Sequence, residues 1–198
     1  MKPRKRKGQP GLRRVDPIAI PPRPLYVNQL ARARRLLDRV ANRTAPSQEA
    51  FLARLDDYQD DLYSFFVSCW HVKDWLQNDP LLSSAIGADA IALVVKDVHR
   101  SFPLLICGDV ANGIKHLGLT EPKIGSGAKV AMYGFRHEVG GAGISFEHFI
   151  IVPEDRVRGT HEAHETAYEV GCTALREWRR ILEKHALPLP PRWTDPQM

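Results

Sequence analysis

Four side chains with acid–base or charge-stabilising chemistry lie in one short stretch, CGDVANGIKHLGL, which begins at Cys107. Asp109, Asn112 and His116 are spaced i, i+3, i+7, so a helix aligns them along one face. Lys115 lies beside them in a run that is otherwise apolar. A carboxylate, an amide and an imidazole in one line could transfer protons, contact RNA or form a structural network. We therefore take this stretch as the first candidate site.

A second polar pair lies in CWHVKDW, where His71 and Asp74 are spaced i, i+3. Apolar residues surround the pair, so we expect both side chains in the buried half of a central helix. If that helix packs against the one that carries Asp109, five polar side chains converge. An unpartnered buried polar group costs about 1–3 kcal/mol, so these groups must pair with one another or with a ligand.

The spacing leaves three interpretations open. The first is a structural network that sets helix register, for example Asp74 with Lys115 and Asp109 with a histidine. The second is a catalytic or RNA-contacting site. The third is a metal site in a helical bundle, because histidine and carboxylate suit zinc, iron or manganese. Its ligands would be His71, Asp74, Asp109 and His116. The Glu-x-x-His motif that such bundles use is absent, so we predict no metal and no other cofactor.

The middle of the first stretch, ANGIKH at 111–116, resembles the Arg-Asn-x-x-x-His motif of HEPN domains. These are all-helical bundles, and many are metal-independent ribonucleases of toxin and phage-defence systems. In that family the arginine and the histidine face each other across a homodimer, where they stabilise charge and transfer protons. Here Asn112 matches the asparagine and His116 the histidine, whereas Ala111 stands in the place of the arginine.

The resemblance implies a HEPN-like homodimer that binds RNA, or a ribonuclease-type protein that has lost its motif arginine. The resemblance implies His116 and Asn112 at the centre of the site, and the spacing of the polar residues adds Asp109, Lys115, His71 and Asp74 as supporting residues. The CWHVKDW and NGIKH stretches together are also similar to a pattern in uncharacterised bacterial helical proteins. The alternative is a non-catalytic interaction protein in which the same polar residues form a structural network.

Two other segments match the Arg-x4-His spacing: RILEKH, from Arg180 to His185, and RVRGTH, from Arg156 to His161. In an arginine-rich chain with eight histidines, such matches arise by chance. Charged neighbours near a helix end indicate a solvated face for Arg180 and His185. The other pair straddles an expected strand-to-helix turn, so its members cannot share one helix face.

The N-terminal 25 residues carry the positive charge of the chain. They hold eight basic residues against Asp16, a net charge of +7, whereas the whole chain carries +5, so the remainder is slightly acidic. A flexible basic segment can hold RNA phosphates by counterion release, and it can equally be a disordered terminus that aids solubility. The candidate RNA-binding residues are Lys2, Arg4, Lys5, Arg6, Lys7, Arg13 and Arg14.

Targeting signals are not recognisable in the sequence. No apolar h-region follows the basic N-terminus, and no apolar run is long enough to cross a bilayer. Cys69, Cys107 and Cys172 form no CxxC pair, which favours reduced, buried thiols. We expect a cytoplasmic protein that does not bind membranes.

The elements that must position the polar residues are mostly helical. Hydrophobic periodicity predicts helices at about 26–43, 47–78, 81–101, 102–118 and 160–187, with Gly87 as a weak point in the third. β-branched and aromatic residues on both sides of GGAG predict a β-hairpin at about 129–152. The fold class is therefore mainly α: an antiparallel bundle of four to five helices with one β-hairpin inserted before the last helix. We expect a basic, proline-rich tail at 1–25, the helical domain at 26–186 and a proline-rich tail at 187–198.

Overall fold

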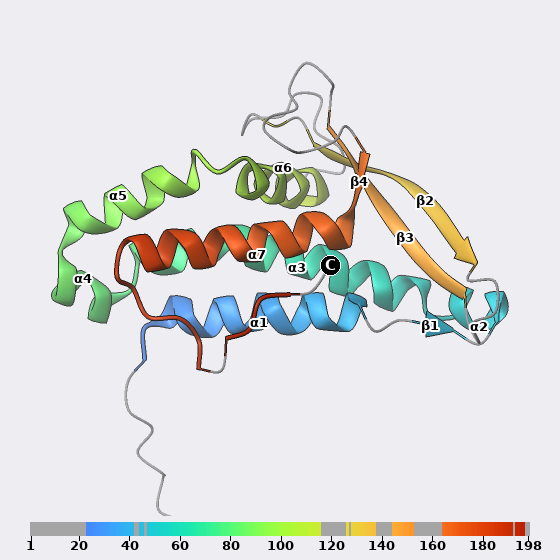
Figure 1. Cartoon of the computed structure of the whole chain (residues 1–198), viewed down its shortest axis with the longest axis horizontal. Coiled ribbons are helices and arrows are strands. Elements are labelled where there is room, and N and C mark those ends of the chain that lie inside the picture. Colours follow the sequence, from blue (N-terminus) through green and yellow to red (C-terminus); the bar gives the residue numbers. More distant parts are fainter. Residues whose placement is uncertain are drawn as a thin grey trace, which may run out of the picture.

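A computed structural model of the chain describes residues 23–41, 44–45, 47–115, 126, 128–137, 144–152, 164–191 and 193–196. Helices dominate this part of the chain, which confirms the expected fold class (Figure 1). The helices are α1 (Leu25–Ala41), α2 (Gln48–Leu52), α3 (Leu55–Gln77), α4 (Pro80–Ile86), α5 (Ala88–Val98), α6 (Phe102–Lys115) and α7 (Ala167–Lys184). The strands are β1 (Thr44–Ala45), β2 (Lys129–His137), β3 (Ile144–Ile151) and β4 (His164–Thr166).

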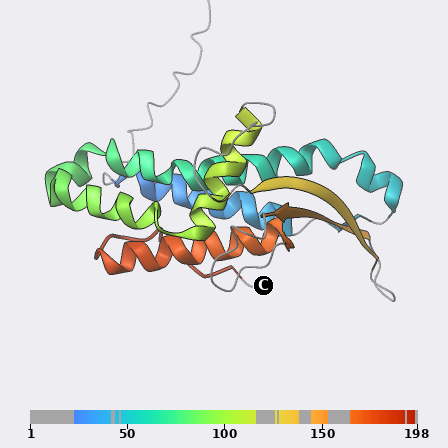
Figure 2. The ribbon, with the colours of Figure 1, turned by 90° about the horizontal axis from the view of Figure 1, so that it is seen from above.

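Helix α3 is the central element of the domain. Its apolar residues recur at three- and four-residue steps, and Leu62, Phe65 and Val72 on this stripe are fully buried. Helices α1, α5, α6 and α7 all contact α3. Helix α1 runs antiparallel to α3 and α7 (Figure 1), and α6 crosses the long axis of these helices steeply (Figure 2). The core therefore lies around the middle of α3.

Helices α1 and α7 enclose α3 with the apolar stripes that the sequence predicts. Leu30, Ala33, Leu37 and Val40 of α1 are all buried. The corresponding residues of α7 are Ala167, Gly171, Ala174, Trp178 and Ile181, and all are buried. The indole Nε1 of Trp178 donates a hydrogen bond of 3.0 Å to the main-chain oxygen of Cys69, which joins α7 to the middle of α3.

Two of the predicted helices are interrupted. The segment expected to be one helix at 47–78 turns at residues 53–54 between α2 and α3. The helix expected at 81–101 divides at Gly87, whose φ of 82° is a left-handed value that glycine adopts without strain. Buried Asp79 caps α4, because its carboxylate accepts hydrogen bonds from the main-chain nitrogens of Leu81 and Leu82. The same carboxylate accepts the main-chain N–H of Leu25, so it also ties down the start of α1.

The predicted hairpin is present, and two short strands extend it. Strands β2 and β3 pair antiparallel, with a register shift between Val130 and Met132. Strands β1 and β4 both pair with the other edge of β3. The last helix begins at Ala167 and not near Thr160, because Thr166 forms a capping box with Glu169 and the residues just before it are in β4.

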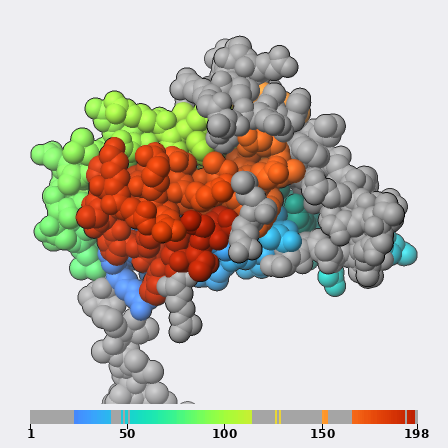
Figure 3. Space-filling view, viewed as in Figure 1, coloured from blue at the N-terminus to red at the C-terminus, as the bar shows by residue number. Residues whose placement is uncertain are grey.

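The proline-rich C-terminal segment, residues 187–191 and 193–196, packs against the helical domain. Tyr26 of α1 donates a hydrogen bond of 2.8 Å to the main-chain oxygen of Pro188. Arg34 donates to the main-chain oxygen of Thr194, and Arg179 pairs with Asp195 at 2.9 Å. Figure 3 shows this segment in dark red, beside α7 on the face that also presents α1. The segment is thus attached to the bundle.

The three cysteines are free thiols with buried side chains, as the sequence predicts. Burial raises the pKa of the Cys107 thiol, which lies against Cys69 across the α3–α6 contact. Among the helices that the structure describes, none combines the length and the apolar content needed to cross a bilayer.

Gly171 allows α7 to approach α1 and α3 closely, which gives a first prediction. A Cβ at this position would lie 2.6 Å from Leu37 Cδ1 and 3.0 Å from Phe65 Cε1, and both neighbours are fully buried. Overpacking costs about 1–3 kcal/mol, and alanine returns up to about 1 kcal/mol of helix propensity. We expect Gly171→Ala to lower the midpoint of thermal unfolding. Gly113→Ala is the matched control, because a Cβ there meets nothing within 4 Å; equal melting temperatures for the two variants would contradict the packing.

Candidate functional site

Asp109 is a buried carboxylate with a structural partner. Its side chain in α6 is 2% exposed, and Oδ2 accepts hydrogen bonds from the main-chain nitrogen of Ser126 at 2.8 Å and from Ser126 Oγ at 2.5 Å. Ser126 is itself fully buried, and its Oγ accepts the main-chain N–H of Ala128 at 3.2 Å. Asp109 therefore fixes the main chain that leads into β2. Of the three interpretations of the polar stretch, this geometry fits the structural network.

The remaining residues of the ANGIKH motif lie at the end of α6. Ala111, in the place of the family's arginine, is buried with 6% exposure, and Asn112 is half-buried. Lys115 is the last residue of the helix, and its side chain lies outside the described part. His116 also lies outside the described residues, so its alignment with Asp109 and Asn112 stays a prediction.

His71 and Asp74 lie at the surface, which corrects the expectation that they belong to the buried half of α3. Their side chains are 48% and 42% exposed, and His71 Nε2 is 4.0 Å from Asp74 Oδ2, too far for a hydrogen bond. Asp74 forms an ion pair with Lys73. Trp75 on the same outward stripe is 42% exposed. The wide apolar arc of this helix led us to overestimate the burial of His71 and Asp74, because Trp75, which belongs to that arc, faces outward.

The five-residue convergence is therefore not observed, since a buried Asp109 and an exposed His71 and Asp74 do not share one enclosed site. The described residues contain no group of three or more histidine, cysteine, aspartate or glutamate side chains placed to hold a metal ion. The candidate RNA-binding residues of the basic tail, Lys2, Arg4, Lys5, Arg6, Lys7, Arg13 and Arg14, lie outside the described part of the chain.

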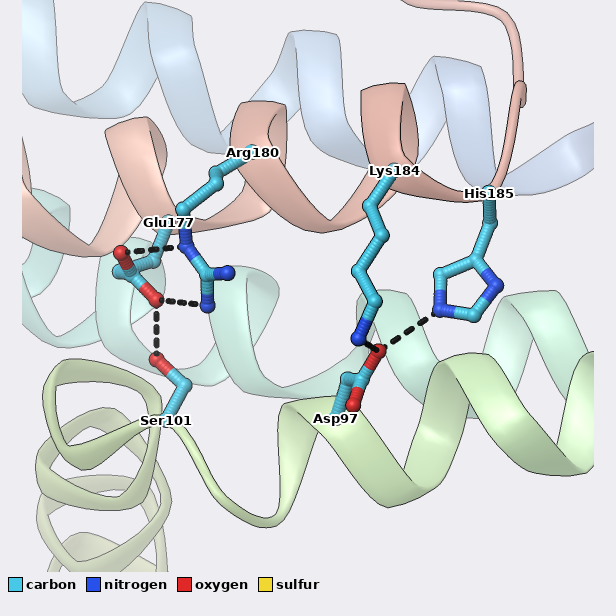
Figure 4. Close-up of polar contacts among 6 residues, drawn as sticks. All are labelled: Asp97, Ser101, Glu177, Arg180, Lys184 and His185. Atoms are coloured by element: carbon cyan, nitrogen blue, oxygen red, sulfur yellow. Dashed lines mark hydrogen bonds and ion pairs between the residues drawn. The ribbon is translucent and has the colours of Figure 1, made fainter.

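A polar seam between α5 and α7 was not anticipated from the sequence. Asp97 Oδ2 accepts hydrogen bonds from Lys184 Nζ and pairs with His185 Nε2, each at 2.7 Å (Figure 4). These contacts hold the pKa of Asp97 below its usual range, the hydrogen bond from Lys184 being the largest cause and that from His185 the next. The Asp97 and His185 side chains are 16% and 18% exposed, so the imidazole is not on a fully solvated face as the sequence suggested.

One turn away in the same seam, Glu177 connects α7 to the start of α6. Its carboxylate pairs with the Arg180 guanidinium at 3.0 and 2.9 Å and accepts a hydrogen bond of 3.0 Å from Ser101 Oγ (Figure 4). Arg180 and His185 thus each bind a separate carboxylate and act as structural contacts. The periodic charges on α7 could have signalled the seam, because Glu177, Arg180 and Lys184 are spaced i, i+3, i+7.

A pocket lies between α1 and the C-terminal segment, and sequence reasoning missed it as well. Its volume is about 230 Å³, and it is lined by Ala31, Arg34, Arg35, Asp38, Pro190, Pro191, Trp193 and Thr194. Arg34 Nε donates to Asp38 Oδ1 at 2.8 Å, so one guanidinium and one carboxylate in the pocket balance each other. Arg35 is exposed and has no ion-pair partner among the described residues. The pocket therefore carries a net positive charge.

Comparison with known proteins adds no family to this geometry. No model of a protein family, no curated protein and no solved structure matches the chain. The HEPN resemblance rests on the ANGIKH stretch and the general helical layout, and it stays a prediction together with the homodimer that it implies.

The structural role of Asp109 gives a second prediction. Asp109→Asn removes the charge that receives two hydrogen bonds inside the protein, and we expect a loss of about 1.5–3 kcal/mol in the free energy of unfolding. Asp74→Asn is the matched control, because the Asp74 side chain is 42% exposed. This substitution should change the free energy of unfolding by less than about 0.5 kcal/mol. Urea denaturation measures both. A stable Asp109→Asn protein would return this residue to the list of functional candidates.

The α5–α7 seam gives a third prediction, on pH. The folded-state pKa of Asp97 is depressed, so its contribution to stability is present at neutral pH and is lost as pH falls through the folded pKa, below about 3.9. We expect Asp97→Asn to melt at a lower temperature than wild type at neutral pH. The difference between the two melting temperatures should shrink as the pH falls toward and below about 3.9. Asp60→Asn, which replaces an exposed carboxylate of α3, is the control and should melt near the wild-type temperature at neutral pH. If the difference in melting temperature between Asp97→Asn and wild type did not change with pH, the charge of Asp97 would not be what stabilises the fold.

Proposed function

We propose that this chain is a HEPN-like helical protein that binds RNA without cleaving it. The observation that carries the proposal is a line of exposed arginines on α1, which directly follows the basic N-terminal residues. Arg32, Arg35 and Arg39 are all exposed and spaced i, i+3, i+7, so they share one face of the helix. Of these, only Arg39 has an ion-pair partner among the described residues, Asp61 at 2.8 Å.

Unpaired guanidinium groups on one helix face suit a phosphate backbone. Each can donate two parallel hydrogen bonds to a phosphate, and each phosphate contact releases condensed counterions. Arg23, just before α1, is exposed too, so the basic character of the first 25 residues continues onto the folded domain. Together these groups supply the sequence-independent electrostatic attraction that non-specific RNA binding requires.

The absence of cleavage follows from the motif region. Phosphodiester cleavage needs a positive group to stabilise developing charge, and Ala111 supplies none at the position of the motif arginine. Asp109 on the same helix is already engaged by Ser126 and is buried, so it is not free to transfer a proton to a substrate. Lys115 would not replace the missing guanidinium, because an ammonium lacks the planar fork of donors.

A second candidate is a non-catalytic interaction protein that does not bind RNA. The buried Asp109–Ser126 contact favours this second candidate, because polar groups that stabilise the fold by bonding to each other need no ligand. RNA binding separates the two candidates.

The fourth prediction tests RNA binding with the full-length protein. We expect it to bind a labelled single-stranded RNA in fluorescence anisotropy, with affinity that falls steeply between about 50 and 200 mM salt. Replacing the basic residues of the tail by glutamine should weaken binding and flatten the salt dependence by about 0.7 in log–log slope for each lost phosphate contact. The substituted residues are Lys2, Arg4, Lys5, Arg6, Lys7, Arg13 and Arg14.

The control for catalysis is His116→Ala, which should leave the RNA intact to the same degree as wild type. RNA cleavage by wild type that His116→Ala abolishes would overturn the non-cleaving part of the proposal. Failure of the wild-type protein to bind RNA at low salt would favour the interaction protein instead.

A further inference from the structure

The pocket between α1 and the C-terminal segment combines a charge with an aromatic ring. Trp193 lines it opposite the helix, and Arg35 approaches it from the exposed face of α1. Pro190 and Pro191 add flat apolar surface on the side of Trp193. A guanidinium beside an aromatic platform is the combination with which proteins hold single-stranded nucleic acids, because the ring stacks on a base and the cation holds a phosphate.

From this arrangement we infer that the pocket binds one nucleotide unit of single-stranded RNA, with the base against Trp193 and the adjoining phosphate on Arg35. The inference rests on the proposed RNA-binding function and deepens it by naming the site and the part of the ligand that it holds. The size of the pocket agrees with a single nucleotide unit. Its volume of about 230 Å³ is below the roughly 300–1,000 Å³ of pockets that hold whole drug-sized ligands. One ring system fits such a volume, and the rest of the strand continues outside it.

The charges in the pocket favour an anion next to Arg35. The Arg34 guanidinium is satisfied by Asp38 and by the main-chain oxygen of Thr194, so it positions the wall of the pocket. Arg35 has no such partner among the described residues and is the group free to meet a phosphate. The exposed Arg32 lies one turn before Arg35 on the same face, in line for the next phosphate of the strand.

One polar group near the ring is suited to the edge of a base. Trp193 Nε1 is shielded from solvent and has no hydrogen-bond partner among the described residues, so the ring and not its N–H is the part that meets a base. Asp38, with a side chain that is 48% exposed, can accept a hydrogen bond from an exocyclic amine at the opposite wall.

The walls of this pocket are anchored, which suits a site with a defined shape. The main-chain N–H of Trp193 bonds to the oxygen of Pro190 at 3.1 Å, so the segment turns at the ring. The contacts of Pro188 with Tyr26 and of Asp195 with Arg179 hold the segment on both sides of this turn. The main chain that carries the ring is thus held in place before any ligand arrives, and binding loses less conformational freedom.

The fifth prediction tests this site in the full-length protein by anisotropy with labelled oligouridylate and oligoadenylate. We expect Trp193→Ala to weaken binding by about 5- to 150-fold while leaving the slope against salt unchanged, because stacking releases no counterions. Trp193→Phe should restore most of the affinity, since it keeps a ring. Arg35→Ala should weaken binding and reduce the log–log salt slope by about 0.7, one phosphate contact.

Two control variants remove similar groups elsewhere. Trp75→Ala deletes an exposed tryptophan of α3, and Arg100→Ala deletes an exposed arginine after α5 that does not line the pocket. Both should bind RNA nearly as wild type does. Melting curves for all variants show whether the domain stays folded, and Arg35→Ala keeps the inference testable if Trp193→Ala unfolds, because Arg35 is exposed.

The outcomes separate this inference from the proposed function. RNA binding by wild type that is unchanged in Trp193→Ala and Arg35→Ala overturns the inference and leaves the proposed function standing. No RNA binding by wild type overturns both. A loss in Trp193→Ala that Trp193→Phe does not restore overturns the stacking contact. Ribose 5-phosphate raising the melting temperature as much as uridine monophosphate would also overturn it, because a phosphate alone would then account for binding.

Discussion

The enclosure of α3 is the constraint on which the rest of this structure depends. The buried stripe of this helix is too apolar to face water, so it needs other helices to cover it, and segments distant in sequence supply them. The buried hydrogen bond from Trp178 to the main chain of Cys69 fixes α7 along α3, and Gly171 lets the two approach closely. Once α7 is placed, α5 docks on it through Asp97 and Glu177 binds the start of α6.

Periodicity in the sequence predicts the parts of the fold that depend on which face of a helix is apolar. The stripes on α1 and α7 are of this kind, and so is the interruption at Gly87, because glycine marks a backbone conformation that other residues avoid. The turn near residue 53 and the short strands β1 and β4 carry no such local signal. The two strands form because β2 leaves the other edge of β3 free to pair, and pairing of that kind is not encoded in a local pattern.

At the candidate site, too, the sequence indicates local features and misses the contacts between distant segments. Spacing left open whether Asp109 is structural, catalytic or metal-binding, and the structural interpretation expected a histidine as its partner. The observed partner is Ser126, 17 residues further on, and no helical periodicity reaches it. His71 and Asp74 were misplaced because an apolar surrounding in sequence does not say which neighbouring helix covers each stripe. The pocket at Arg35 and Trp193 was out of reach for a related reason: a proline-rich terminus looks like a tail until its hydrogen bonds to α1 and α7 are known.

These long-range contacts also bear on how the chain acquires its structure during synthesis. Tyr26 and Pro188 are separated by 162 positions, Arg34 and Thr194 by 160, and Cys69 and Trp178 by 109. As the ribosome releases α1 and α3, the helix that completes their enclosure has not yet been made. The early helices therefore wait with apolar faces uncovered, at the stage where chaperones act and aggregation competes. A message that stalls translation within α7 would yield a chain that holds most of the core residues and lacks the element that brings them together.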